Sequence, residues 1–229
     1  YLMVTTNKFN KISIDEIWNA ENIYHLKTDL NRISKLIYHY EIYKKIIDIP
    51  GDIIECGVFK GTSLIRFLTF RHILESENSR KIYGFDAFGK FPKPTRLMEK
   101  KILKWWVNQA GDGISLNELK EIIKKKKIHN FELIRGDVIK TIPSFIQKNE
   151  RIKISLLHLD MDVYKPTKFI LDKLANKIVK GGIILIDDYN SVYGATEAVD
   201  EFLKKNRNLK IKKLTNYKGR FRPFYIVID

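Results

Sequence analysis

Short apolar runs alternate along this chain with segments whose apolar residues recur every three or four positions. The runs are too short for helices and are typical of buried strands, at 52–55, 81–85, 131–134, 153–159 and 182–186. The segments between and after them have a helical period, at 62–74, 115–127, 142–147, 166–180 and 194–205. This alternation predicts an α/β fold with a doubly wound, mostly parallel sheet.

The N-terminal part of the chain has a helical period and no strand pattern, from residue 13 to residue 49. Ser13 is followed three positions later by Glu16, which is the spacing of a capping box. We expect two or three helices here, packed on the sheet or over its ligand site. The chain then divides into an N-terminal helical extension or cap, 1–49, and a main domain, 50–229.

Two further strand-length segments follow the last predicted helix, at 210–214 and 223–228. We therefore expect an antiparallel hairpin at the sheet edge, with its turn near Lys218-Gly219.

Two of the predicted strands end in pairs of carboxylates. The strand at 153–159 leads to Asp160 and Asp162, and the strand at 182–186 leads to Asp187 and Asp188. A helix-length segment joins the two strands, so they form a βαβ unit and end at the same edge of the sheet. Four carboxylates this close repel one another unless a cation or protons neutralise them, and oxygen ligands suit Mg²⁺. The alternative is that some of them only cap the following helices.

The first predicted strand runs into a glycine turn. The spacing from Glu55 through Gly57 to Gly61 is Glu-x-Gly-x-x-x-Gly, and a helix follows. Glycines at such a turn let the backbone approach a ligand closely. The spacing differs from the dinucleotide fingerprint Gly-x-Gly-x-x-Gly, which argues against a nicotinamide oxidoreductase. Cys56 fits a small buried strand residue better than a nucleophile.

The second predicted strand ends at Asp86, which is placed to accept hydrogen bonds from a ribose diol or to form a turn. An insertion follows at 87–112, and its middle, 97–107, has a helical period and contains Trp105-Trp106. Such a segment suits a lid or one wall of a substrate pocket. The alternative is that the tryptophans pack on the core.

The composition limits the partners. The chain has 229 residues and a net charge of +15, which suits nucleic acid, an anionic membrane surface or a phosphorylated substrate. Many lysines fall in helical segments such as 120–127 and form a solvated face, so we do not expect nucleic acid as a partner. No apolar run is long enough to span a bilayer. The single cysteine excludes an internal disulfide and suits the cytoplasm.

Taken in order, these motifs resemble those of the macrocin O-methyltransferase family, which are class I S-adenosylmethionine-dependent methyltransferases. The resemblance covers roughly residues 50–229 and is carried by 51–58, 84–88, 159–164, 181–182 and 186–189. It implies a Rossmann-like class I methyltransferase sheet with an antiparallel C-terminal hairpin. It also implies transfer of the methyl group of S-adenosylmethionine to a sugar hydroxyl, in a nucleotide sugar, a glycan precursor or a glycosylated natural product.

The resemblance assigns roles to residues by position. Mg²⁺ or another divalent cation would be held by Asp160, Asp187 and Asp188. Asp86 would bind the ribose of the cofactor, and Asp137 would lie near the adenine. The methionine part of the cofactor would be surrounded by residues of the first turn, namely Glu55, Gly57, Gly61, Thr62 and Ser63.

The catalytic base is expected to be Asp162, acting beside Asp160. Related metal-dependent enzymes such as catechol O-methyltransferase place a lysine just after the first metal-binding aspartate, but Val163 stands at the corresponding place here. Asp162 is the nearest group able to take a proton. His158, on the same strand face as Asp160, is interpreted as a hydrogen-bonded core residue or as support for the site.

Other functions remain open at the level of the sequence. The positive charge suits an RNA or protein methyltransferase on the same fold, and a non-catalytic cofactor-binding protein would share the glycine turn. For the sugar-methylating reading, the charge favours a phosphorylated small-molecule acceptor. The sequence leaves both a monomer and a homo-oligomer open.

Overall fold

The computed structural model describes residues 13–91, 96–214 and 223–229. Its centre is a seven-stranded sheet in the order β3-β2-β1-β4-β5-β7-β6. Five strands are parallel, namely β1 (Asp52–Cys56), β2 (Ile82–Asp86), β3 (Phe131–Arg135), β4 (Ile154–Leu159) and β5 (Ile178–Ile186). The predicted doubly wound, mostly parallel sheet is therefore confirmed.

The predicted C-terminal hairpin is confirmed in its pairing. Strand β7 (Phe224–Val227) runs antiparallel to both β5 and β6 (Ile211–Lys213), so β7 is an inner strand and β6 forms the edge. The turn expected near Lys218-Gly219 lies outside the described residues. Strand β5 begins at Ile178, earlier than predicted, because the helix before it ends at Leu174 and a short 3-10 turn at Ala175–Lys177 follows.

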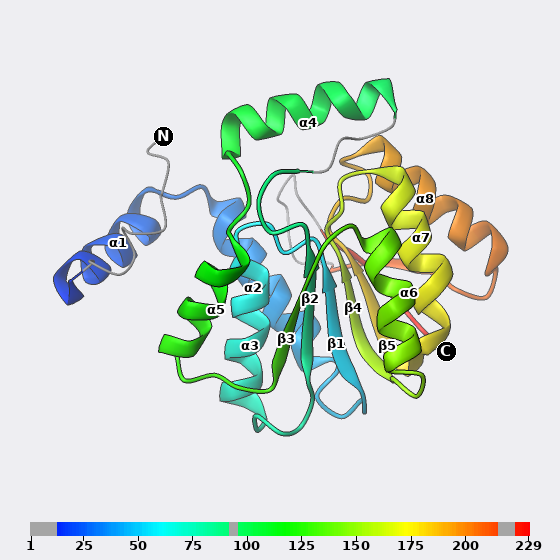
Figure 1. Ribbon diagram of the computed structural model, residues 1–229, viewed down its shortest axis with the longest axis horizontal. Coiled ribbons are helices and arrows are strands. Elements are labelled where there is room, and N and C mark those ends of the chain that lie inside the picture. The colour runs from blue at the N-terminus through cyan, green and yellow to red at the C-terminus, as the bar shows by residue number, and fades with distance from the viewer. Residues whose placement is uncertain (1–12, 92–95, 215–222) are drawn as a thin grey trace.

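Helices cover both faces of the sheet (Figure 1). One face carries α2 (Leu30–Lys44), α3 (Thr62–Leu74) and α5 (Leu116–Lys125), and the other carries α6 (Val138–Lys148), α7 (Tyr164–Leu174) and α8 (Tyr193–Lys205). None of the helices in the described part of the chain combines the length and the apolar character that a bilayer crossing requires.

Two apolar cores lie on either side of the central strands. Ile53 packs with α2 and α3, whereas Ile54, the next residue, packs with α6 and α7 on the opposite face. Leu156 and Leu157 divide in the same way. Successive strand residues point to opposite faces, so a strand covered on both sides needs apolar residues at every position. This requirement explains the continuous apolar runs of the sequence.

The N-terminal helices behave differently from each other. Helix α1 (Ile14–Lys27) has the predicted capping box at Ser13 and Glu16 but contains no buried residue, and Trp18 is 63% exposed. Helix α2 buries Tyr38, His39, Ile42 and Tyr43. The expected packing on the sheet is therefore right for α2, whereas α1 buries no residue in the described part of the chain and adds nothing to the core.

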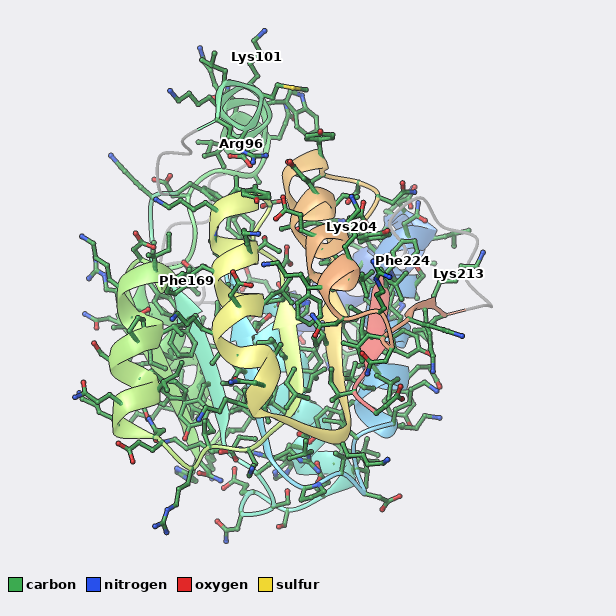
Figure 2. The ribbon with its side chains drawn as sticks, turned by 90° about the vertical axis from the view of Figure 1, so that its right-hand side faces the viewer. Arg96, Lys101, Phe169, Lys204, Lys213 and Phe224 are labelled. Carbon is green, nitrogen blue, oxygen red and sulfur yellow. The ribbon has the colours of Figure 1, made fainter. Side chains whose placement is uncertain are left out.

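The insertion after β2 forms a helix as predicted. Helix α4 (Leu97–Ala110) lies across the end of the molecule that carries the first turns of α7 and α8 (Figures 1 and 2). Trp105 is 60% exposed, so it is not a core residue. The position of α4 suits the wall or lid interpretation of this segment.

At the other end of the sheet, where the parallel strands begin, a buried arginine holds several segments together. Arg80 is 5% exposed and forms a salt bridge with Glu75 at 2.8 Å. Its guanidinium also donates to the hydroxyl of Ser155 in β4, at 2.7 Å, and to four backbone carbonyls at 46–51, after α2. All the donors of this side chain thus serve the packing of α2 and α3 on β4.

We expect Arg80→Met to lower the free energy of unfolding by about 3–5 kcal/mol, because it leaves the carboxylate of Glu75 buried without its partner. Urea unfolding followed by circular dichroism measures this change. The control is Lys81→Met, since Lys81 pairs with Glu132 at 2.7 Å at the surface; its loss is expected to cost less than about 1 kcal/mol. Equal effects of the two substitutions would contradict this account.

Candidate functional site

The carboxylates at the ends of β4 and β5 come together as the sequence predicts. Leu159 pairs with Ile186, so the residues that follow each strand lie side by side. Oxygen atoms of Asp160, Asp187 and Asp188 all lie within 4.8 Å of one another. These three residues, called the acidic triad below, are those predicted to hold a divalent cation.

Asp162 belongs to the same loop but stands outside the triad. Its backbone N–H donates to Oδ2 of Asp188 at 2.9 Å, and its φ of 60° places it in the left-handed region. Aspartate tolerates this conformation better than most residues. The loop therefore folds back on Asp188 and keeps the Asp162 carboxylate near the triad.

The carboxylates of the site carry more negative charge than the neighbouring cationic groups neutralise. Burial, together with the charge of Asp187, raises the pKa of Asp160 to about 7. Burial and the charges of Asp162, Asp160 and Asp187 raise the pKa of Asp188 well above its usual range. A bound divalent cation would relieve this repulsion, and three carboxylate oxygens are the ligands that Mg²⁺ accepts. The residues present therefore fit the ion that the sequence predicts.

Sequence reasoning missed two residues of the site, both from α2. The ammonium of Lys35 donates to Oδ2 of Asp187 at 2.6 Å, and the hydroxyl of Tyr38 donates to Oδ1 of the same residue at 3.0 Å. Although burial opposes ionisation of Asp187, the charge and hydrogen bond of Lys35, the charge of His158 and the hydrogen bond of Tyr38 lower its pKa. Lys35 and Tyr38 are three positions apart, so they share one helix face.

A buried polar layer lies under the triad. Nδ1 of His158 is 3.0 Å from Oε1 of Glu55, and neither side chain is exposed. Within the described residues, both ring nitrogens of His39, Nε2 of His158 and Oε2 of Glu55 have no hydrogen-bond partner. His158 is thus the hydrogen-bonded core residue that one interpretation expected. Glu55, predicted to lie beside the cofactor, is fully buried, and its Oε1 contacts His158.

The glycine turn after β1 packs directly on the backbone of Asp160, at the end of β4. Gly57 has a φ of +96°, and a Cβ placed on it would lie 1.8 Å from the carbonyl oxygen of Asp160. The N–H of Asp160 in turn donates to the carbonyl of Cys56 at 3.0 Å. Only glycine permits this approach. The turn and the triad therefore share one edge of the sheet, as predicted.

The start of α3 offers backbone donors beside this turn. Gly61, with a φ of +82°, is the N-cap residue, and no side chain caps the helix. Thr62 is exposed and Ser63 is buried. The free N–H groups of a helix N-terminus favour an anion such as a carboxylate.

Asp86 and Asp137 differ in how well they suit a ligand. Asp86 accepts hydrogen bonds from the N–H of Phe59 at 2.9 Å and of Phe88 at 2.7 Å, so it holds the ends of β1 and β2 together. Its carboxylate oxygens keep further lone pairs for a ligand. Asp137 is exposed and accepts from the N–H of Ile139 at 3.0 Å, as the N-cap of α6. This cap explains why α6 begins at Val138, before the predicted start at 142.

Helix α4 is fixed above the site at its N-terminal end. The guanidinium of Arg96 stacks on the ring of Tyr164 at 3.7 Å and pairs with Glu197 of α8. The buried carboxylate of Glu99 accepts from the N–H of Tyr164 at 2.8 Å. Figure 2 shows Arg96 beside the first turns of α7 and α8. These contacts join the insertion to α7 and α8, the helices that follow β4 and β5.

Comparisons with known proteins agree with this arrangement. The model of the macrocin O-methyltransferase (TylF) family matches residues 27–216. The chain is 24% identical to demethyldecarbamoylnovobiocin O-methyltransferase of Streptomyces niveus over 69% of its own length and 60% of that protein. It is 22% identical to 8-demethyl-8-(2,3-dimethoxy-alpha-L-rhamnosyl)-tetracenomycin-C 4'-O-methyltransferase of Streptomyces olivaceus, over 79% of this chain and 68% of that protein.

A solved structure shows the same fold. The calicheamicin methyltransferase CalS11 superposes with a TM-score of 0.76, at 23% identity, over 97% of this chain and 89% of that chain. The likeness confirms the Rossmann-like methyltransferase architecture over nearly the whole chain.

The contact between Gly57 and Asp160 can be tested by adding one methyl group. Gly57→Ala is expected to lower the free energy of unfolding by at least about 2 kcal/mol more than Gly89→Ala. Gly89 is a matched control because its φ is also positive, at +146°, but a Cβ there meets nothing within 4 Å. Urea unfolding of both variants separates backbone strain, which they share, from the clash with Asp160. Similar losses would show that the close approach does not hold the site together.

Proposed function

This chain belongs to the macrocin O-methyltransferase family, and on that premise we propose that it transfers the methyl group of S-adenosylmethionine to a sugar hydroxyl at a divalent metal site. The observation that carries the proposal is the acidic triad, whose oxygens lie within 4.8 Å of one another beside the Gly57 turn. A methyl donor at the turn and a metal-bound hydroxyl at the triad would then lie at one edge of the sheet.

The relatives support the class of acceptor. The name of the Streptomyces olivaceus protein describes 4'-O-methylation of a tetracenomycin that carries a rhamnosyl group. CalS11 is described as a TDP-rhamnose 3'-O-methyltransferase. We propose a small-molecule sugar acceptor for this chain, either a nucleotide sugar or a glycoside. Lys100, Lys101 and Lys104 are exposed on α4, and they favour a phosphorylated acceptor.

The cofactor would lie along the ends of β1 and β2. S-adenosylmethionine supplies a methyl group on a positively charged sulfur, already activated for transfer. The Gly57 turn permits close approach of the methionine part, and the free N–H groups at the start of α3, near Thr62 and Ser63, suit its carboxylate. Asp86, held by two backbone N–H groups, is placed for the ribose diol. Asp137 remains a candidate neighbour of the adenine.

The triad would position the acceptor. A divalent ion lowers the pKa of a hydroxyl bound to it and fixes the direction of that hydroxyl. Asp160, Asp187 and Asp188 would supply the oxygen ligands, while the hydroxyl of Tyr38 holds Oδ1 of Asp187. This hydrogen bond limits rotation of the Asp187 carboxylate, which would keep the acceptor oxygen in one place relative to the donor.

Asp162 is proposed as the general base. Burial and the charge of Asp187 raise the pKa of Asp162, and a carboxylate with a raised pKa is a better proton acceptor. S-adenosylmethionine would supply the methyl group and leave as S-adenosylhomocysteine when its methyl–sulfur bond breaks. A carboxylate oxygen of Asp162 would take the proton that the acceptor hydroxyl loses as its oxygen bonds to the methyl carbon. The hydrogen bond from the N–H of Asp162 to Asp188 keeps this group at the site.

An RNA or protein methyltransferase on the same fold is the second candidate, and the net charge of +15 is the observation that favours it. Phosphate would be repelled by the acidic triad unless a cation were bound there. Loss of methyl transfer to sugars in EDTA, with recovery in excess Mg²⁺, would favour the sugar-methylating proposal. Transfer to RNA or protein that persists in EDTA would favour the alternative.

We expect Asp160→Asn to reduce kcat/KM for sugar methylation by at least ~10³-fold, because it removes a charged ligand at almost constant volume. The affinity for S-adenosylmethionine, measured by calorimetry, should change by less than about threefold. Asp172→Asn, at an exposed position of α7, serves as control and should leave both values unchanged. An Asp160→Asn variant with normal turnover and unchanged sensitivity to EDTA would refute the metal assignment.

Asp162→Asn tests the base without disturbing the loop, because asparagine also tolerates the φ of 60°. We expect kcat to fall by ~10²–10⁴-fold, while binding of cofactor and Mn²⁺ persists. Single-turnover measurements across pH isolate the chemical step, and the acidic limb of the rate profile should disappear. Near-normal turnover would mean that another group or water takes the proton.

A further inference from the structure

Lys35 brings a positive charge to the place where a divalent ion would bind. Its Nζ lies 2.6 Å from Oδ2 of Asp187 and 3.8 Å from Oδ2 of Asp160. Two of the three triad carboxylates therefore face one ammonium group. Its side chain is 28% exposed, which leaves the ammonium a route to solvent.

The lysine is delivered by a packed helix. Tyr38, one turn further along α2, donates its hydroxyl to Oδ1 of Asp187 at 3.0 Å, so both oxygens of that carboxylate contact α2. The same helix is anchored by His39 and Ile42, neither of which is exposed. The backbone that carries Lys35 is thereby fixed relative to β5, and only the side chain has freedom to move.

We propose that Lys35 is a built-in counter-ion of the metal site, which neutralises the acidic triad when no metal is bound and competes with the metal for it. The proposal rests on the proposed function, since it concerns the same site. It assigns Lys35 a positioning role and makes it a determinant of metal affinity.

The competition follows from charge and geometry. Like charges repel, so an ammonium within 4 Å of two triad oxygens disfavours a divalent ion on the same oxygens. Metal binding then requires the Lys35 ammonium to withdraw, which its flexible four-carbon stem permits. Without metal, removal of the ammonium leaves buried carboxylates facing one another, and this arrangement is unfavourable.

The test compares Lys35→Met with the unchanged protein, because methionine keeps an unbranched stem without the charge. Mn²⁺ affinity is measured by calorimetry, and the midpoint of thermal unfolding is measured in EDTA and in excess Mn²⁺. We expect the Kd for Mn²⁺ to fall by at least about tenfold. We also expect a lower unfolding midpoint in EDTA, which Mn²⁺ restores. Lys35→Arg, which keeps the charge, should retain the original behaviour in both measurements.

Lys44→Met provides the matched control on the same helix. Lys44 pairs only with Glu41 among the salt bridges of the described residues, at 3.2 Å, and its side chain is 44% exposed. Its replacement should leave both the Mn²⁺ affinity and the midpoint in EDTA unchanged. If Lys35→Met does not fold, Lys35→Gln replaces it, since glutamine keeps a hydrogen-bond donor for Asp187 but no charge.

The outcomes separate this inference from the function proposed above. Suppose that the unchanged protein binds Mn²⁺. If Lys35→Met then binds Mn²⁺ equally or more weakly, the counter-ion role is overturned. If neither protein binds a divalent ion, the metal-dependent function fails. In that case a lower midpoint for Lys35→Met still supports Lys35 as the counter-ion, and an equal midpoint rejects it.

Discussion

The parallel pairing of β4 with β5 is the constraint on which the site depends. It brings the residues after Leu159 and Ile186 to one edge of the sheet, and these residues are aspartates. A fold that buries like charges together has to balance them with cations, protons or hydrogen bonds. The ammonium of Lys35, the hydroxyl of Tyr38 and the N–H of Asp162 all serve this balance. In the chemistry that we propose, the negative charge that these groups leave unbalanced binds the divalent cation.

The central part of the fold follows from the sequence because each strand is covered on both faces. Ile53 and Ile54 both need apolar surroundings, so the strands appear as continuous apolar runs that differ clearly from the helical period. The glycine turn was a weaker signal, because Gly57 suits a tight turn as well as a ligand. The structure adds that a Cβ on Gly57 would lie 1.8 Å from the carbonyl oxygen of Asp160. The triad could be predicted because strand order alone places the ends of β4 and β5 together.

The remaining features depend on packing that no local pattern records. Lys35 and Tyr38 reach the site only because α2 buries the face that includes His39 and Ile42, and the sequence does not say how that helix is rotated on the sheet. Asp137 has the spacing of a cofactor ligand and of a helix cap, and local hydrogen bonding settled only the second role. Helix α1 carries apolar residues at helical spacing, yet none of its residues is buried among the parts of the chain that the structure describes.

Cys56 sits between Glu55 and Gly57 at the end of β1, and it has no exposed surface. Burial, with the nearby charges of Glu55 and Asp86, raises the pKa of its thiol, so the thiolate that reacts with alkylating reagents is suppressed. It is the only cysteine of the chain. A cysteine introduced on the exposed side of α4 would thus be the one accessible thiol. A single fluorescent or spin label there would report whether α4 changes position when small molecules are added.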